Sequence, residues 1–333
     1  AEEVDADVLR RDVLAKGSIA LVGVPVLGKL LAGSAGPGEL ALPSQVGTAD
    51  VAEIKNTTEQ LRAGARSLGG QARAVSAAAT QYGRLTSVPP ANDAARTGLF
   101  SHLAELNELA GWCCFDSGAD LHARWHYRQA VDLAHQVGDR YRMASATRLM
   151  GVIDGVRGNP EQAMKQYEMA NLVLGPGGDP ELISWLHALS ANTLARMDHP
   201  NATEELVKAQ DGWRPANALE SADMAYQTAL IHMDLGNLDA AEQFAASVNG
   251  AGRVRPVGVF ASVLRATIHV RAGEPRGLLM AKSAIDAVAP LHSVRARERL
   301  QPLATALHAR PGSDYKELAR TANAIATSRT TAT

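Results

Sequence analysis

Residues 99–139 read LFSHLAELNELAGWCCFDSGADLHARWHYRQAVDLAHQVGD, and the predicted fold follows from the pattern in this segment. Apolar and small residues recur in it every three or four positions, which is the spacing of the buried face of a helix. The segment DSGAD at 116–120 separates two such patterns, because glycine ends one helix with a positive φ and aspartate can begin the next. The stretch therefore predicts a helix hairpin.

Small residues mark the same hairpin four more times along the chain. In the first helix of each unit they are Gly111, Gly151, Ser190, Ala229 and Ala266. Twelve residues later come Ala123, Ala163, Ala202, Ala241 and Leu278. Seven residues further on come Ala130, Ala170, Ala209, Val248 and Ile285. The recurrence of the same spacings in each unit is the signature of a repeat architecture, so the sequence predicts about five stacked helix pairs.

The whole chain divides into four predicted parts. An apolar segment and a Gly/Pro linker occupy residues 1–49, and two helices follow over 50–98. The repeats cover 99–310, and residues 311–333 form a capping helix and a disordered tail. The predicted fold class is all-α, a right-handed α-solenoid of helix hairpins with an N-terminal helical extension.

Composition supports this class and excludes others. Aromatic residues make up only 4% of the chain, which suits closely packed helices and argues against a β-sandwich. The formal net charge of −2 gives no reason to expect direct contact with nucleic acid, which calls for a clustered basic surface. Cys113 and Cys114 are adjacent and point apart on a helix, so a disulfide between them is disfavoured. Two unpaired thiols indicate a reducing compartment, and we expect a cytoplasmic protein.

The repeats resemble the tetratricopeptide repeat. The matching residues of the first unit are Gly111, Gly118, Ala123, Tyr127 and Ala130. The units depart from that family in being longer than its usual 34 residues. Asn107 stands where the family has a tryptophan, and the third and fifth units are degenerate.

A narrower resemblance follows from the segment VGTADVAEIKNTTEQLRAGARSLGG at 46–70, which precedes the repeats. Residues 46–310 resemble the C-terminal region of actinobacterial, Streptomyces-type transcriptional regulators, most specifically over Leu109–Asp139. Those proteins carry an N-terminal helix-turn-helix of the Cro/repressor type, which we do not find in this chain. The resemblance implies a domain that senses a peptide, protein or small-molecule effector and controls DNA binding by such a head, with homodimerisation as a further expectation.

The binding surface is expected on the concave face, which the first helix of each unit lines. Steps of 3.6 residues from the small positions also place Glu105, Ser145, Ala191 and Asp223 on this face. The predicted ligand- or peptide-binding residues are Glu108, Trp112, Arg148, His187, Tyr226, Met233, Phe260 and Arg271. Mixed charge with aromatic rings suits a peptide or an amphipathic small molecule. The competing interpretation is that these are surface residues that contact only water.

Three interpretations compete for RRDVLAKGSIALVGVPVLGKLLAG at 10–33. Gly23-x4-Gly28-Lys29 is nearly a phosphate-binding loop, but Leu30 stands where that motif needs Ser or Thr, and no alternation of strands and helices follows. Arg10 and Arg11 before an apolar run are similar to an export signal, although acidic residues precede them. The interpretation we favour is an apolar connector that packs on the repeats or on a second copy. No membrane association is expected.

Few other residues suggest chemistry. His122 and His126 lie four residues apart, as metal ligands can, but a site needs three or four ligands and no others are evident. Cys114 and His126 could meet on adjacent helices. We predict no catalytic residue, metal or cofactor. The alternatives to a regulator are a stand-alone protein–protein scaffold and an enzyme of secondary metabolism whose pocket would need Trp112, Arg148, His187 and Tyr226.

Overall fold

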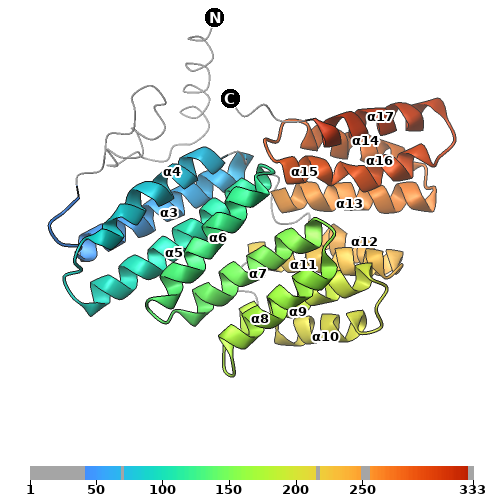
Figure 1. The fold of residues 1–333 in the computed structure, drawn as a ribbon. Helices are drawn as coiled ribbons and strands as arrows, with labels where there is room; N and C mark the ends of the chain where they lie inside the picture. Colours follow the sequence, from blue (N-terminus) through green and yellow to red (C-terminus); the bar gives the residue numbers. More distant parts are fainter. Residues whose placement is uncertain (1–41, 69–70, 215–217, 249–255, 329–333) are drawn as a thin grey trace, which may run out of the picture. The chain divides into compact units, whose positions relative to one another are not determined.

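The computed structural model describes residues 42–68, 71–214, 218–248 and 256–328 (Figure 1). The chain divides after Leu40 into two units, and the described residues belong to the second. The apolar stretch at 10–33 and its three interpretations therefore lie outside the described residues.

The described part of the chain is helical, which confirms the predicted all-α class. Extended pairing within it is limited to an isolated bridge between Val46 and Pro90. None of the helices described is both long and apolar enough to cross a membrane.

The helices follow one another with short connections. Before the repeats come α3 (Thr48–Leu68), α4 (Ala72–Gly83) and a short 3-10 helix, η1 (Arg84–Ser87). The helices of the repeat region are α5 (Asp93–Asp116), α6 (Asp120–His135), α7 (Arg140–Val156), α8 (Pro160–Leu174), α9 (Pro180–Arg196), α10 (Ala202–Gly212), α11 (Ala218–Asp234), α12 (Leu238–Ser247), α13 (Pro256–Ala272) and α14 (Arg276–Val288). The last helices are α15 (Val294–Glu298), α16 (Leu300–His308) and α17 (Ser313–Thr327).

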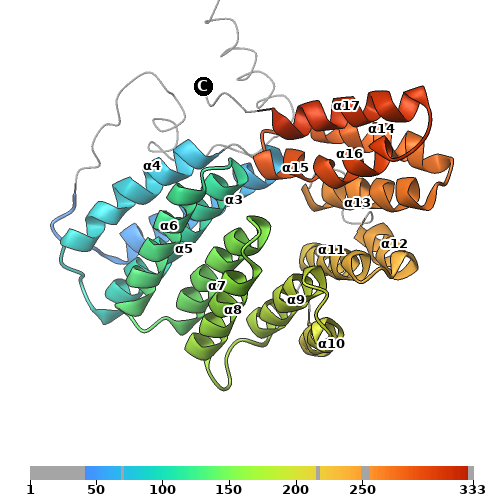
Figure 2. The same cartoon turned by 45° about the vertical axis from the view of Figure 1, so that its right-hand side comes forward.

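Neighbouring helices pack in pairs, α5 with α6, α7 with α8, and so on to α13 with α14 (Figures 1 and 2). Each first helix also contacts the first helix of the next pair, from α5 to α7 through to α11 and α13. Helices α3 and α4 pack on α5, and α16 packs on α13 and α17. Buried residues accordingly form several clusters between successive pairs rather than one centre.

Close approach within a pair depends on glycine facing tyrosine. A Cβ atom added at Gly111 would lie 2.5 Å from the ring of Tyr127, and one added at Gly151 would lie 2.6 Å from the ring of Tyr167. Both tyrosines are buried. The glycines predicted from the repeat pattern are therefore positions where the two helices of the first and second pairs approach closely.

The turn between the paired helices repeats one backbone conformation. The residue with positive φ in the successive turns is Gly118, Gly158, Asp198, Gly236 and Gly273. Asp198, at φ 57°, takes the left-handed conformation that glycine adopts in the other four turns. The third unit is thus irregular in sequence but keeps the turn.

The fifth unit differs from the predicted phase by one residue. We expected Leu278 at the close-packed position of α14, but Gly277 is buried there and Leu278 is only partly buried. A Cβ atom on Gly277 would lie 2.8 Å from the backbone nitrogen of Val270. The prediction was wrong because the close-packed residue follows the positive-φ glycine by four residues here, from Gly273 to Gly277, and by five residues in the first unit, from Gly118 to Ala123.

Candidate functional site

Helix α15 is short, yet it contacts the first helix pair of the repeat region. The Ser293 hydroxyl donates to Oδ1 of Asp116 over 2.6 Å, joining residues 177 positions apart. The same hydroxyl accepts from the backbone N–H of Ala296 over 2.9 Å and so caps α15. We call Ser293–Arg299 the α15 segment; its first residues are fixed on the C-terminal end of α5.

Arg295 anchors the α15 segment to α5. Its guanidinium lies 4.6 Å from the ring centre of Trp112 and 4.4 Å from that of Phe115. The residue is only 7% exposed. Burial, and then repulsion by Arg299, lower the pKa of Arg295 to about 10. The faces of the two rings attract the guanidinium cation. They do not, however, provide hydrogen-bond acceptors for all of its N–H groups.

Arg299 lies one helical turn after Arg295 and contacts the last two helix pairs of the repeat region. Its guanidinium lies 4.0 Å from the ring centre of Phe260 on α13 and 5.7 Å from that of Tyr226 on α11. Its Nε donates to the hydroxyl of Tyr226 over 3.0 Å. The α15 segment therefore joins α5 to α11 and α13 through two arginines spaced four residues apart.

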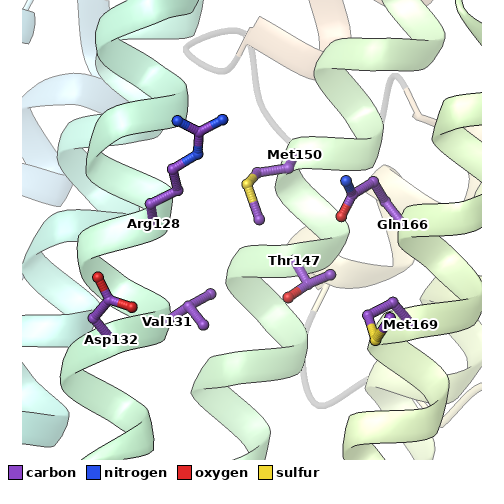
Figure 3. Close-up of a pocket in the computed structure, with 7 residues that line it drawn as sticks. All are labelled: Arg128, Val131, Asp132, Thr147, Met150, Gln166 and Met169. Carbon is purple, nitrogen blue, oxygen red and sulfur yellow. The ribbon is translucent and has the colours of Figure 1, made fainter.

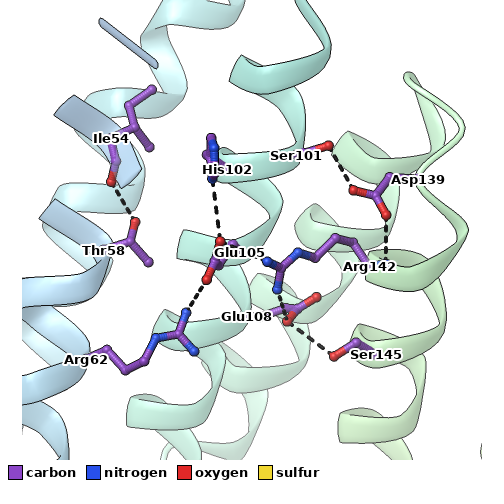
Figure 4. A network of polar contacts seen from close by, with 10 residues as sticks. All are labelled: Ile54, Thr58, Arg62, Ser101, His102, Glu105, Glu108, Asp139, Arg142 and Ser145. Carbon is purple, nitrogen blue, oxygen red and sulfur yellow. Dashed lines mark hydrogen bonds and ion pairs between the residues drawn. The ribbon is translucent and has the colours of Figure 1, made fainter. Parts of the chain in front are cut away.

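A polar network lies on α3, α5 and α7 beside this contact (Figure 4). Arg62 and Arg142 both pair with Glu105. Oε2 of Glu108 accepts from Ser145 over 3.2 Å and from Arg142 over 3.4 Å. Glu108 is 9% exposed, and burial raises its pKa to about 7, against the opposing charges of Arg142 and Arg148.

Four buried polar atoms near Tyr127 have no hydrogen-bond partner within the described residues. They are Oε1 of Glu108, the hydroxyl of Tyr127, Nε of Arg148 and Nε of Arg295. Burial raises the pKa of the Tyr127 hydroxyl, while the charges of Arg295 and Arg148 lower it and that of Glu108 raises it. The charges of Arg295, Arg148 and Glu108 thus all act on Tyr127, and we call these four residues the Tyr127 cluster.

Five of the eight predicted binding residues belong to this region. Glu108 and Arg148 are part of the Tyr127 cluster. Trp112, Tyr226 and Phe260 contact the arginines of the α15 segment. Counting along first helices thus selected residues that the structure places around α15.

The other three predicted residues belong neither to the Tyr127 cluster nor to the ring partners of the α15 arginines. Nδ1 of His187 lies 2.7 Å from Oε2 of Glu205, so His187 faces its hairpin partner α10. Met233 packs against the apolar cluster of α11, α12 and α13. Arg271 is exposed in the last turn of α13. A 3.6-residue count does not distinguish the inner side of a helix from the sides that pack on its neighbours.

Sequence reasoning missed the residues of the α15 segment, together with Phe115 and Tyr127 as site residues. The run SVRARER at 293–299 carries an arginine at every second position, and this was the available signal. Its placement against α5 depends on contacts over 177 residues, which no local pattern contains.

A second polar chain connects α4, α5 and α6. Nε2 of His126 lies 3.0 Å from Oγ of Ser76, and Nδ1 lies 2.9 Å from Oδ1 of Asn107. Ser76 also reaches Sγ of Cys114 at 3.5 Å. The order serine, histidine, asparagine is that of a nucleophile, a base and its orienting group. However, burial lowers the pKa of His126 to about 4, which makes it a weak base at neutral pH.

Acyl transfer at Ser76 would also need donors for an oxyanion. Ser76 lies inside α4, where the neighbouring backbone N–H groups bond within the helix. The chain Ser76–His126–Asn107 therefore serves best as a packed polar contact between three helices. Groups of three or more His, Cys, Asp or Glu that could hold a metal are absent from the described residues.

A shallow groove of about 200 Å³ lies between α6, α7 and α8 (Figure 3). Val131, Met150 and Met169 give it an apolar lining, with Arg128, Asp132, Thr147 and Gln166 around them. Its volume is below the roughly 300 Å³ at which small-molecule pockets begin. It shares no residue with the Tyr127 cluster or the α15 segment.

Comparison with known proteins adds no assignment. No family model matches the chain, and the search of curated proteins gives no match.

Proposed function

We propose that this chain is an effector-sensing or interaction domain of a transcriptional regulator. In this proposal the helix pairs form a tetratricopeptide-like, right-handed α-solenoid. The recognition surface is the part of α5, α11 and α13 that meets the α15 segment, together with Arg148 on α7. The resemblance in sequence supports the regulator, and the arrangement of the site supports the recognition surface.

One observation carries the proposal: the Tyr127 cluster holds four buried polar atoms without partners. In folded proteins nearly all buried polar atoms are paired, because each unpaired one costs free energy. Such a group gathered beside Trp112, the most exposed aromatic residue of the site, is poorly explained by stability alone. It is well explained by a binding partner that supplies the missing hydrogen bonds.

The α15 segment gives the proposal a route for signalling. It joins α5 to α11 and α13, so an effector that binds more tightly in one placement of α15 will shift the population towards that placement. The shift would pass to a DNA-binding head or to a dimer interface. We propose a cytoplasmic protein with a peptide, protein or small-molecule effector.

A stand-alone protein–protein scaffold is the second candidate. The specific observation in its favour is that a peptide segment, α15, already binds this surface by stacking arginines on aromatic rings. A partner protein could present a similar helix. The enzyme alternative loses support because His187 lies against Glu205 rather than with Trp112, Arg148 and Tyr226.

The test uses the full chain with Arg148→Ala, and Arg320→Ala as the matched control, since Arg320 is exposed on α17. A thermal-shift screen of metabolites and native mass spectrometry of the purified protein would identify a small effector. Pull-down from cell extract would identify a constant protein partner. We expect stabilisation or capture that is lost in Arg148→Ala and kept in Arg320→Ala.

A small effector supports the sensor, and a constant protein partner supports the scaffold. For the regulator, that effector should change DNA binding by a co-purifying helix-turn-helix protein. Binding that persists unchanged in Arg148→Ala would contradict a recognition surface at this place.

A further inference from the structure

Three arginines of the site have no carboxylate partner within the described residues. Arg62 and Arg142 pair with Glu105, but Arg148, Arg295 and Arg299 form no ion pair. Arg299 uses its Nε on a tyrosine hydroxyl instead. The site therefore carries an excess of positive charge in a partly buried place.

A buried cation without a counter-ion is costly, and proteins usually pair it. Arg295 is the clearest case, because it is 7% exposed and its Nε has no acceptor. Stacking on Trp112 and Phe115 offsets part of this cost but satisfies no N–H group. Asp116 attracts Arg295 electrostatically, but no carboxylate within the described residues forms an ion pair with its guanidinium.

We propose that the Tyr127 cluster binds a small oxyanion, the carboxylate or phosphate group of a metabolite, between Arg148 and Arg295. Three donors without acceptors could bind it: Nε of Arg148, Nε of Arg295 and the hydroxyl of Tyr127. Guanidinium groups bind such oxyanions through charge-assisted hydrogen bonds. This inference rests on the proposed function and specifies its ligand.

Glu108 adds a second requirement. When Glu108 is ionised, its Oε1 is a buried acceptor without a donor, while Oε2 is already used by Ser145 and Arg142. A hydroxyl or ammonium group next to the acid group of the ligand would donate to Oε1. The favoured class is therefore a hydroxy acid or an amino acid rather than a plain carboxylate.

Part of the cluster is open to solvent. Trp112 is 38% exposed, and Arg148 and Arg299 are partly exposed, whereas Tyr127 is buried. A ligand would approach beside Trp112 and reach Arg148 first. Arg295, which is already packed on Trp112 and Phe115, would contact the same anion from the α15 segment.

The experiment measures binding of three probes to the full chain by calorimetry and thermal shift at constant ionic strength. Citrate carries carboxylates and a hydroxyl, tricarballylate lacks the hydroxyl, and inorganic phosphate tests an oxyanion without carbon. We expect citrate or phosphate to stabilise the protein beyond an equal ionic strength of sodium chloride. If citrate binds, tricarballylate should bind several-fold more weakly because Glu108 then lacks its donor.

Two variants locate the site. Arg148→Gln and Arg295→Met should each weaken binding by about tenfold or more, since each removes a charge-assisted hydrogen bond. Arg320→Gln, at an exposed position on α17, should bind as the unaltered chain does. Arg295→Met keeps a long side chain for packing. If this variant still fails to fold, Arg148→Gln tests whether the anion binds at this site, because it leaves α15 intact.

The inference is wrong if neither anion stabilises the protein beyond sodium chloride, or if both variants bind as tightly as the unaltered chain. If the anions fail while an uncharged molecule or a peptide binds in a way that needs Arg148, the proposed function stands and the oxyanion is excluded. If no class of ligand or partner depends on Arg148, both proposals fail.

Discussion

The α5–α6 hairpin and the α15 segment are held by opposite kinds of contact. In the hairpin, Gly111 faces Tyr127 only 16 positions along the chain, and the contact is apolar and tight. The α15 segment is held over 177 positions by hydroxyl, guanidinium and ring contacts. The first contact builds the fold, and the second brings together unpaired polar atoms that the fold does not need.

The largest effect is expected at the hairpin. Gly111→Val should lower the free energy of unfolding by about 4 kcal/mol, because its Cβ would overlap a buried ring that cannot move aside. Gly83→Val is the matched control, since nothing lies within 4 Å of a Cβ atom there. It should change stability by less than about 0.5 kcal/mol. Urea denaturation measures both, and equal losses would show that the hairpin contact is not special.

Glu108, between the two regions, should make stability depend on pH. Its pKa is raised from 4.5 to about 7, so between these values the unfolded chain releases a proton that the folded chain keeps. Stability therefore falls as pH rises through this window. Glu108→Gln should raise the free energy of unfolding by about 2 kcal/mol at pH 8 and leave it nearly unchanged at pH 4.5.

Arg142 remains paired with Glu105 in that variant. Glu317→Gln, at an exposed position on α17, is the control and should show no such dependence on pH. Urea denaturation at the two pH values gives the measurement. A loss of stability in Glu108→Gln at pH 8 would mean that its bonds to Arg142 and Ser145 outweigh the cost of burial.

The smallest effect is expected at the α15 segment. Ser293→Ala removes the cap on Ala296 and the bond to Asp116, and should cost about 1 kcal/mol. If α15 serves recognition more than stability, Ser293→Ala should weaken ligand binding clearly, while the melting temperature should change little. Ser313→Ala is the control, because Ser313 is exposed and, within the described residues, its hydroxyl bonds to its neighbour Asp314. Equal effects of the two changes on affinity would remove α15 from the site.

Local sequence patterns predicted the structural features that depend on contacts between residues close together in the chain. The helices, the turns at Gly118 and Gly158, and the close positions Gly111 and Gly151 follow from spacing within about 20 residues. The site was predicted in part, because counting along first helices selects Trp112 and Tyr226 but also His187, which turns towards α10. The arginines of α15 could not be placed, since their partners lie on helices far away in the chain.

The link between Ser293 and Asp116 also governs how the molecule comes apart. In a row of helix pairs where each touches only its neighbours, the ends can fray independently. Here the first pair and the α15 segment hold each other, so neither end of the stretch between them is free to peel away first. We therefore expect the helix pairs between them to separate together, so that unfolding is one cooperative transition instead of several small ones.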